Sequence, residues 1–159
     1  MSSRIAALAV ASLLPIAVQA ADLPKEATDS FSNIWVSTIS NSMQQGANPF
    51  LTYELNGVTQ NDAGGPMFNL LGLRCVGMGD GRGGGEFTDR GTCTYTDKDG
   101  DHIFAPYTSK GWRGTYEVVG GTGKFVGITG AGEYIINNPG QIKSDDKRNR
   151  GFVSKLSSH

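Results

Sequence analysis

The frequency and spacing of its glycines constrain the fold of this chain more than any other sequence feature. All 23 glycines of the 159 residues follow residue 20, and they make the chain about twice as rich in glycine as the usual ~7%. They interrupt short runs of β-branched and aromatic residues. Beyond the N-terminal segment, no window repeats apolar residues at helical spacing. The chain is therefore expected to be all-β, with short strands joined by tight turns.

Eight strands are predicted from the runs between these glycines, at residues 31–39, 50–55, 67–76, 92–97, 102–107, 113–119, 128–137 and 152–156. The Asp99-Gly100 pair between two alternating runs is typical of a hairpin, because glycine takes the positive φ that a tight turn needs. Eight short antiparallel strands close most economically into a barrel or a two-sheet sandwich, since closure removes exposed edges. We predict an eight-stranded antiparallel barrel.

Residues 1–20 have the features of a signal peptide. Arg4 is followed by an apolar core over residues 5–18, and small residues at 18 and 20 suit a cleavage site before Ala21. The core is shorter than the ~20 apolar residues that cross a bilayer. We therefore expect an exported protein, periplasmic or secreted, whose mature chain is a single domain over residues 21–159 without a membrane span.

Charge and cysteine content limit the kinds of partner and metal ion that this chain is expected to bind. Without Arg4 the chain carries 13 basic and 15 acidic side chains, a net charge of −2. Nucleic-acid binders usually collect a basic excess on one face, so no nucleic-acid partner is expected. The two cysteines, Cys75 and Cys93, are expected to form a disulfide in an oxidising compartment. They lack the spacing and histidine neighbours of a metal site.

The stretch VVGGTGKFVGITG, residues 118–130, superficially looks like a phosphate-binding loop. Such a loop needs glycine five positions before the Gly-Lys glycine and a Ser or Thr after the lysine, but Val118 and Phe125 stand there. The following residues are also too rich in glycine to begin a stable helix. We expect a strand, a tight turn and a second strand, with Phe125 and Ile128 inserted as apolar plugs.

Two further strings have ordinary interpretations. Residues 79–84, GDGRGG, match a dinucleotide-binding pattern but continue into a loop and a strand rather than a helix. Asp97, Asp99 and Asp101 alternate as in a calcium loop, yet glycine at the sixth position and glutamate at the twelfth are missing. A hairpin turn is preferred, with adventitious calcium as the alternative, and no metal site is predicted.

Candidate catalytic residues are few. His102 leaves a charged hairpin, where a solvent-exposed role is more common than catalysis. Glu117 and Glu133 lie within predicted strands, and an apolar interior would raise the pKa of these carboxyl groups and make them general acids or bases. Each glutamate alternates with a tyrosine, so only one of the two residue types can face inward.

At the glycine-rich turn the chain resembles the family that contains allene oxide cyclases and dirigent proteins. The shared hallmark is a strand, then Gly-Gly-(Ser/Thr)-Gly-x-Phe, then a glycine-containing strand. It is carried here by Gly120, Gly121, Gly123, Phe125, Gly127 and Gly130. The Gly-x-x-Gly after the phenylalanine is closer to the cyclases, and Thr129 stands where dirigent proteins carry an arginine. The resemblance implies an eight-stranded barrel with an apolar cavity, assembled as a homotrimer.

Two functions follow as hypotheses. In the first, the barrel binds a small apolar or phenolic molecule and isomerises, cyclises or orients it without a cofactor, as the resemblance implies. Its cavity would be lined by Trp112, Tyr116, Val118 and Tyr134, with Glu117 and Glu133 as candidate catalytic groups. In the second, the interior is packed and the protein is a non-catalytic structural or interaction module of the cell envelope. A cavity in the interior separates the two.

Overall fold

The computed structural model describes residues 23, 26–81, 87–136, 142–143 and 149–157. The predicted signal peptide and its cleavage site lie outside the described residues. No helix in the described ranges has the length and apolar character needed to cross a membrane.

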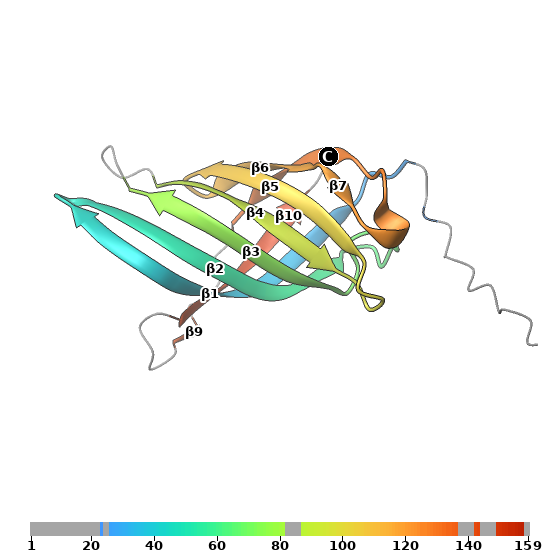
Figure 1. Cartoon of the computed structure of the whole chain (residues 1–159), viewed down its shortest axis with the longest axis horizontal. Coiled ribbons are helices and arrows are strands. Elements are labelled where there is room, and N and C mark those ends of the chain that lie inside the picture. Colours follow the sequence, from blue (N-terminus) through green and yellow to red (C-terminus); the bar gives the residue numbers. More distant parts are fainter. Residues whose placement is uncertain (1–22, 24–25, 82–86, 137–141, 144–148, 158–159) are drawn as a thin grey trace, which may run out of the picture.

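The described chain is all-β, as predicted (Figure 1). The strands are β1 (Ser30–Gln45), β2 (Asn48–Asn61), β3 (Leu71–Asp80), β4 (Thr88–Thr96), β5 (His102–Lys110), β6 (Arg113–Val118), β7 (Gly120–Gly121), β8 (Gly130–Ile135), β9 (Ile142–Lys143) and β10 (Asn149–Ser157). A three-residue 3₁₀ helix, η1 (Gly123–Phe125), is the one helical element in this part of the chain.

All strands belong to one antiparallel sheet, ordered β1-β2-β3-β4-β5-β6-β8-β10-β9, with β7 beside β5. The sheet curls so that β1 also pairs with β10, from Ser30 opposite Ser157 to Thr38 opposite Asn149. Among the described residues, β8 and β10 share one paired position, Ile135 opposite Lys155.

The prediction of a closed eight-stranded barrel is corrected where β8 meets β10, because among the described residues no continuous ladder of hydrogen bonds joins these two strands. β8 is only six residues long and ends at Ile135, the residue that meets β10. The two strands therefore overlap at their ends, whereas β1 and β2 pair along almost their whole lengths.

One side of the curled sheet is apolar and buried. The inward side chains of β3 alternate with exposed ones, as expected for a strand with one covered face. Phe31 stacks on Phe68 with ring centroids 4.3 Å apart, and Tyr95 and Tyr116 meet Phe31 edge-on. Aromatic pairs in these geometries favour a well-ordered core.

The strand predicted over 67–76 begins four residues later than expected. Phe68 and Leu70 adopt positive φ angles of 51° and 54°, which are incompatible with an extended strand. This irregular turn directs the Phe68 ring into the core, where the side chain is 8% exposed. β3 therefore starts at Leu71.

The predicted disulfide is present. Cys75 on β3 and Cys93 on β4 are directly opposite each other in the register of the two strands, and their sulfur atoms are bonded. Both side chains are buried on the inner face. The crosslink thus joins the two strands in the middle of the sheet.

Candidate functional site

The concave face of the sheet encloses a cavity of about 390 Å³. Its wall consists of inward side chains from β1 to β6 and β8, most of them apolar or aromatic. They include Trp35, Leu51, Leu55, Leu73, Cys75, Cys93, Tyr95, Ala105, Trp112, Tyr116 and Tyr134. Both tryptophans of the chain therefore border the cavity. A concave, mainly aromatic site with few polar groups suits a small apolar ligand.

A cluster of three polar side chains interrupts this apolar wall. The Tyr53 hydroxyl on β2 donates a short hydrogen bond to the Asp89 carboxylate on β4. The same hydroxyl lies 2.7 Å from the hydroxyl of Tyr107 on β5, where either oxygen can be the donor. Asp89 is the one carboxyl group among the described residues that line the cavity. We call these three residues the Asp89 cluster.

Two glycines make room for the cluster. Gly77 on β3 lies opposite Gly91 on β4, under the two tyrosine hydroxyls. A Cβ atom on Gly77 would come within 2.5 Å of the Tyr107 hydroxyl and 2.6 Å of the Tyr53 hydroxyl. These glycines, which have no special φ angle, are therefore required for space.

The environment controls the protonation of the Asp89 cluster. Burial raises the pKa of the Asp89 carboxyl from 3.8 to about 6, although the Tyr53 hydrogen bond acts in the opposite direction. Burial, together with the nearby Asp89 charge, also raises the pKa of the Tyr107 phenol well above its ordinary value. Asp89 therefore titrates near neutral pH while the phenols stay protonated. A group with such a pKa suits proton transfer.

The ligand-binding residues predicted from the sequence divide between two sites. Tyr116 and Tyr134 are buried and line the cavity, as does Trp112, whose side chain is 60% exposed beside the β5–β6 turn. Val118 is buried but borders a second hollow of about 670 Å³ toward the other end of the sheet. This second hollow is shared by Tyr116, residues 26–29 and the segment 124–131.

Glu117 and Glu133 do not reach the cavity. Both are exposed, and the tyrosines that alternate with them, Tyr116 and Tyr134, face inward. The condition under which these glutamates were expected to act as acid–base groups is therefore not met. Asp89, which the sequence analysis did not select, occupies the inner face instead.

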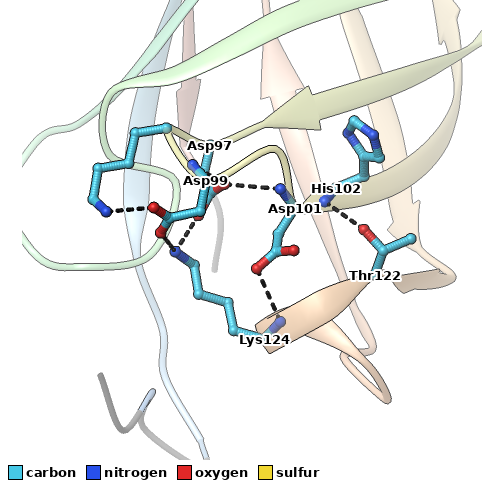
Figure 2. Close-up of polar contacts among 7 residues, drawn as sticks. Asp97, Asp99, Asp101, His102, Thr122 and Lys124 are labelled. Atoms are coloured by element: carbon cyan, nitrogen blue, oxygen red, sulfur yellow. Dashed lines mark hydrogen bonds and ion pairs between the residues drawn. The ribbon is translucent and has the colours of Figure 1, made fainter. Parts of the chain in front are cut away.

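The glycine-rich motif has a structural role that is visible at the tip of the β4–β5 hairpin (Figure 2). Lys124 inserts its ammonium group between the carboxylates of Asp97 and Asp99, with 3.1 Å to Asp99 Oδ2. Its backbone N–H also donates to Asp101 Oδ2, at 3.1 Å. Gly123 has a φ of 53°, and a Cβ there would overlap the Asp101 carboxylate. The lysine of the apparent phosphate loop thus binds the chain's own aspartates.

The same hairpin accounts for the aspartate repeat. Asp97 Oδ1 accepts hydrogen bonds from the backbone N–H groups of Asp99 and Asp101, which fixes the turn. Burial acts to raise the pKa of Asp97, but the Lys124 and backbone hydrogen bonds outweigh it and lower the pKa. Within the described residues, no group of three His, Cys, Asp or Glu side chains is arranged to hold a metal ion.

The remaining motif residues complete this turn. Gly120 and Gly121 form β7, which pairs with Phe104 and Ile103 of β5. Phe125 is buried as the predicted plug, Gly127 has a φ of 81°, and Gly130 begins β8. The His102 backbone N–H donates to Thr122 Oγ1 at 2.8 Å, which ties the motif to the hairpin.

Comparison with known proteins adds no assignment. No family model, curated protein or solved structure matches this chain. Its function therefore has to be inferred from the cavity and the Asp89 cluster.

Proposed function

We propose that this protein is related to the allene oxide cyclases and dirigent proteins, and that its curled sheet binds a small apolar or phenolic molecule in its cavity. The observation that carries the proposal is the 390 Å³ cavity, whose wall is mainly apolar and aromatic with a few polar groups, the Asp89 cluster among them. Natural pockets for small molecules combine a predominantly apolar lining with a few polar groups that orient the ligand. The glycine-rich motif supports the family relationship by resemblance, and export and trimer formation remain part of this proposal.

The alternative, a structural module of the cell envelope, requires a packed interior. The cavity favours binding, because the side chains on the inner face, including the small Ala105, leave this space unfilled. A catalytic role as an isomerase or cyclase without a cofactor would depend on Asp89, since this carboxyl group, unlike Glu117 and Glu133, borders the cavity.

The binding proposal is tested with tryptophan fluorescence, because Trp35 and Trp112 both border the cavity. The mature chain is titrated with a panel of lipid epoxides and phenols, and thermal unfolding is measured in parallel. A ligand in the cavity is expected to change the tryptophan emission and to raise the melting temperature by mass action.

A matched pair of variants locates the binding. Ala105→Phe places a large ring in the cavity, where Ala105 is 1% exposed, and is expected to abolish binding. Thr92→Phe places the same ring on the exposed outer face of β4 and is expected to leave binding unchanged. If no compound binds at millimolar concentration, or if both variants bind like the wild type, the cavity is not a ligand site.

A further inference from the structure

The number of protons in the Asp89 cluster limits the number and direction of its hydrogen bonds. Two contacts are present, Tyr53 with Asp89 and Tyr53 with Tyr107. When Asp89 is ionised, the three side chains carry two protons, one on each phenol. Two hydrogen bonds consume both protons. Tyr53 must then donate to Asp89, and Tyr107 must donate to Tyr53.

This count decides what the ionised cluster offers to a ligand. Its free positions are the second oxygen of Asp89 and the remaining lone pair of Tyr107, which are both acceptors. A ligand can satisfy them only with its own O–H or N–H group. Protonation of Asp89 adds a third proton, so that one donor is left over and can point into the cavity. One proton thus converts an acceptor-only site into a donor site.

We propose that the Asp89 cluster is a proton-controlled recognition site, which selects an apolar molecule bearing a hydroxyl group when Asp89 is ionised and accepts a carbonyl or ether oxygen when Asp89 is protonated. The inference rests on the proposed binding function and specifies its ligand class. At neutral pH the preferred ligand is therefore an aromatic or aliphatic alcohol rather than a ketone or ether of the same shape.

The surroundings support control by this single carboxyl group. The titratable side chains that face Asp89 are tyrosines, namely Tyr53 from β2, Tyr107 from β5 and Tyr134 from β8. Burial keeps the pKa of each phenol above its ordinary value. Between pH 5 and pH 7.5 only Asp89 changes its charge within this group, since its pKa is about 6.

The test compares 2-naphthol with 2-methoxynaphthalene, which differ by the hydroxyl proton. Affinities are measured by tryptophan fluorescence and calorimetry at pH 7.5 and pH 5. At pH 7.5 the naphthol is expected to bind about tenfold more tightly, which is the size of one hydrogen bond to a charged group. At pH 5 the ratio is expected to approach one, because the protonated cluster can donate to the ether.

Three variants separate this mechanism from a merely structural role. Asp89→Asn always carries surplus donors, so its ratio is expected to be near one at both pH values. Tyr53→Phe removes the internal acceptor and frees the Tyr107 proton, so ether binding at pH 7.5 is expected to become stronger although a hydroxyl is lost. Thr115→Val, which removes an exposed hydroxyl on the outer face of β6, away from the cavity, is the control and keeps the wild-type ratio.

The outcomes distinguish the two proposals. Equal binding of both probes by the wild type at pH 7.5, or a ratio that does not change with pH, overturns the proton-controlled site and leaves the binding function standing. Unchanged ether affinity in Tyr53→Phe also overturns it, because the proton count then does not govern recognition. Failure of both probes to bind at millimolar concentration overturns the binding function together with the inference.

Discussion

The buried position of Asp89 lowers the stability of the folded protein when this carboxyl group is ionised. A carboxyl group whose pKa is raised from 3.8 to about 6 binds a proton more tightly in the folded protein than in the unfolded chain. Its favourable contribution is fully present below pH 3.8 and is lost as the pH rises through 6. Above that pH the folded state holds a partly buried charge whose only hydrogen-bond donor in the described structure is Tyr53.

The first prediction concerns this cost. Relative to Asp89→Asn, the wild type is expected to lose about 2 kcal/mol of stability between pH 4 and pH 7, since each pKa unit corresponds to about 1.4 kcal/mol and part of the shift lies outside this range. Thermal or urea unfolding of both proteins across this range measures the difference. Parallel stability curves for the two proteins would show that Asp89 has an ordinary pKa.

Lys124 has the opposite effect on the carboxyl group of Asp97, because it lowers the pKa of that group. Asp97 has a side chain that is 6% exposed and a lowered pKa. The ion pair therefore stabilises the fold above the ordinary carboxyl pKa, and this stabilisation is lost as the pH falls through the lowered pKa of Asp97. Lys124→Met is therefore expected to lower the melting temperature at pH 7, and this difference is expected to shrink below about pH 4.

Lys98 provides the control for this second prediction. It belongs to the same hairpin, but its side chain is 86% exposed, and its ion pair within the described residues is with Asp99. Exposed ion pairs contribute little to stability. Lys98→Met is expected to unfold like the wild type, and a similar loss in both variants would mean that overall hairpin charge, rather than the Lys124 contact, matters.

At the scale of the strands, the positions of small residues shape the inner surface. Glycines on the inner face lie under aromatic rings, as Gly77 and Gly91 do under Tyr53 and Tyr107 and as Gly132 does under Tyr116. A strand with a glycine at such a point loses side-chain packing of its own. In exchange, the ring of a neighbouring strand can lie flat over the backbone, which places the hydroxyls of the Asp89 cluster.

The third prediction tests this arrangement with two glycines of β3. In Gly77→Ala the new methyl group would collide with both tyrosine hydroxyls, and overpacking of this kind costs about 1–3 kcal/mol. In Gly72→Ala the nearest atom is 3.6 Å away on an exposed position, so the change is expected to be neutral or slightly stabilising. Urea unfolding measures both; equal stabilities would show that Gly77 is not needed for space.

Strand positions were largely predictable from the sequence, and the tertiary site was not. Alternation and turn residues are local signals, so all eight predicted strands occur, although β3 begins late at an irregular turn. The disulfide followed from the cysteine content. Asp89, Tyr53 and Tyr107 come from three different strands, and their meeting depends on register and on which face each strand turns inward. The alternation of Asp89 with Gly91 and Cys93 on one face was the available signal.

At the scale of the whole molecule, some neighbouring strands of the sheet are joined by many more interactions than others. β3 and β4 are paired along their length and joined by the Cys75–Cys93 bond, whereas β8 and β10 share one paired position in the described chain. Local opening requires less free energy where fewer hydrogen bonds must break. The junction of β8 and β10 is therefore the part of the sheet that should separate first.

The fourth prediction follows from this difference and uses hydrogen exchange. Amides of β3 and β4 near the disulfide are expected to exchange at least ~10-fold more slowly than the β8 amides directed toward β10. Reduction of the disulfide is expected to lower the protection of β3 and β4. Uniform protection around the sheet would mean that β8 and β10 are held as firmly as the other pairs.

The lysine at the hairpin tip has a consequence for the conditions in which this fold can persist. In calcium-binding loops, clustered aspartates are ordered by a dissolved cation, so the order of such a loop rises and falls with the supply of that ion. Here the counter-charge is a side chain of the same polypeptide, Lys124, and its local concentration is fixed by the fold. The hairpin should thus be equally ordered in calcium-poor and calcium-rich surroundings, and indifferent to chelators.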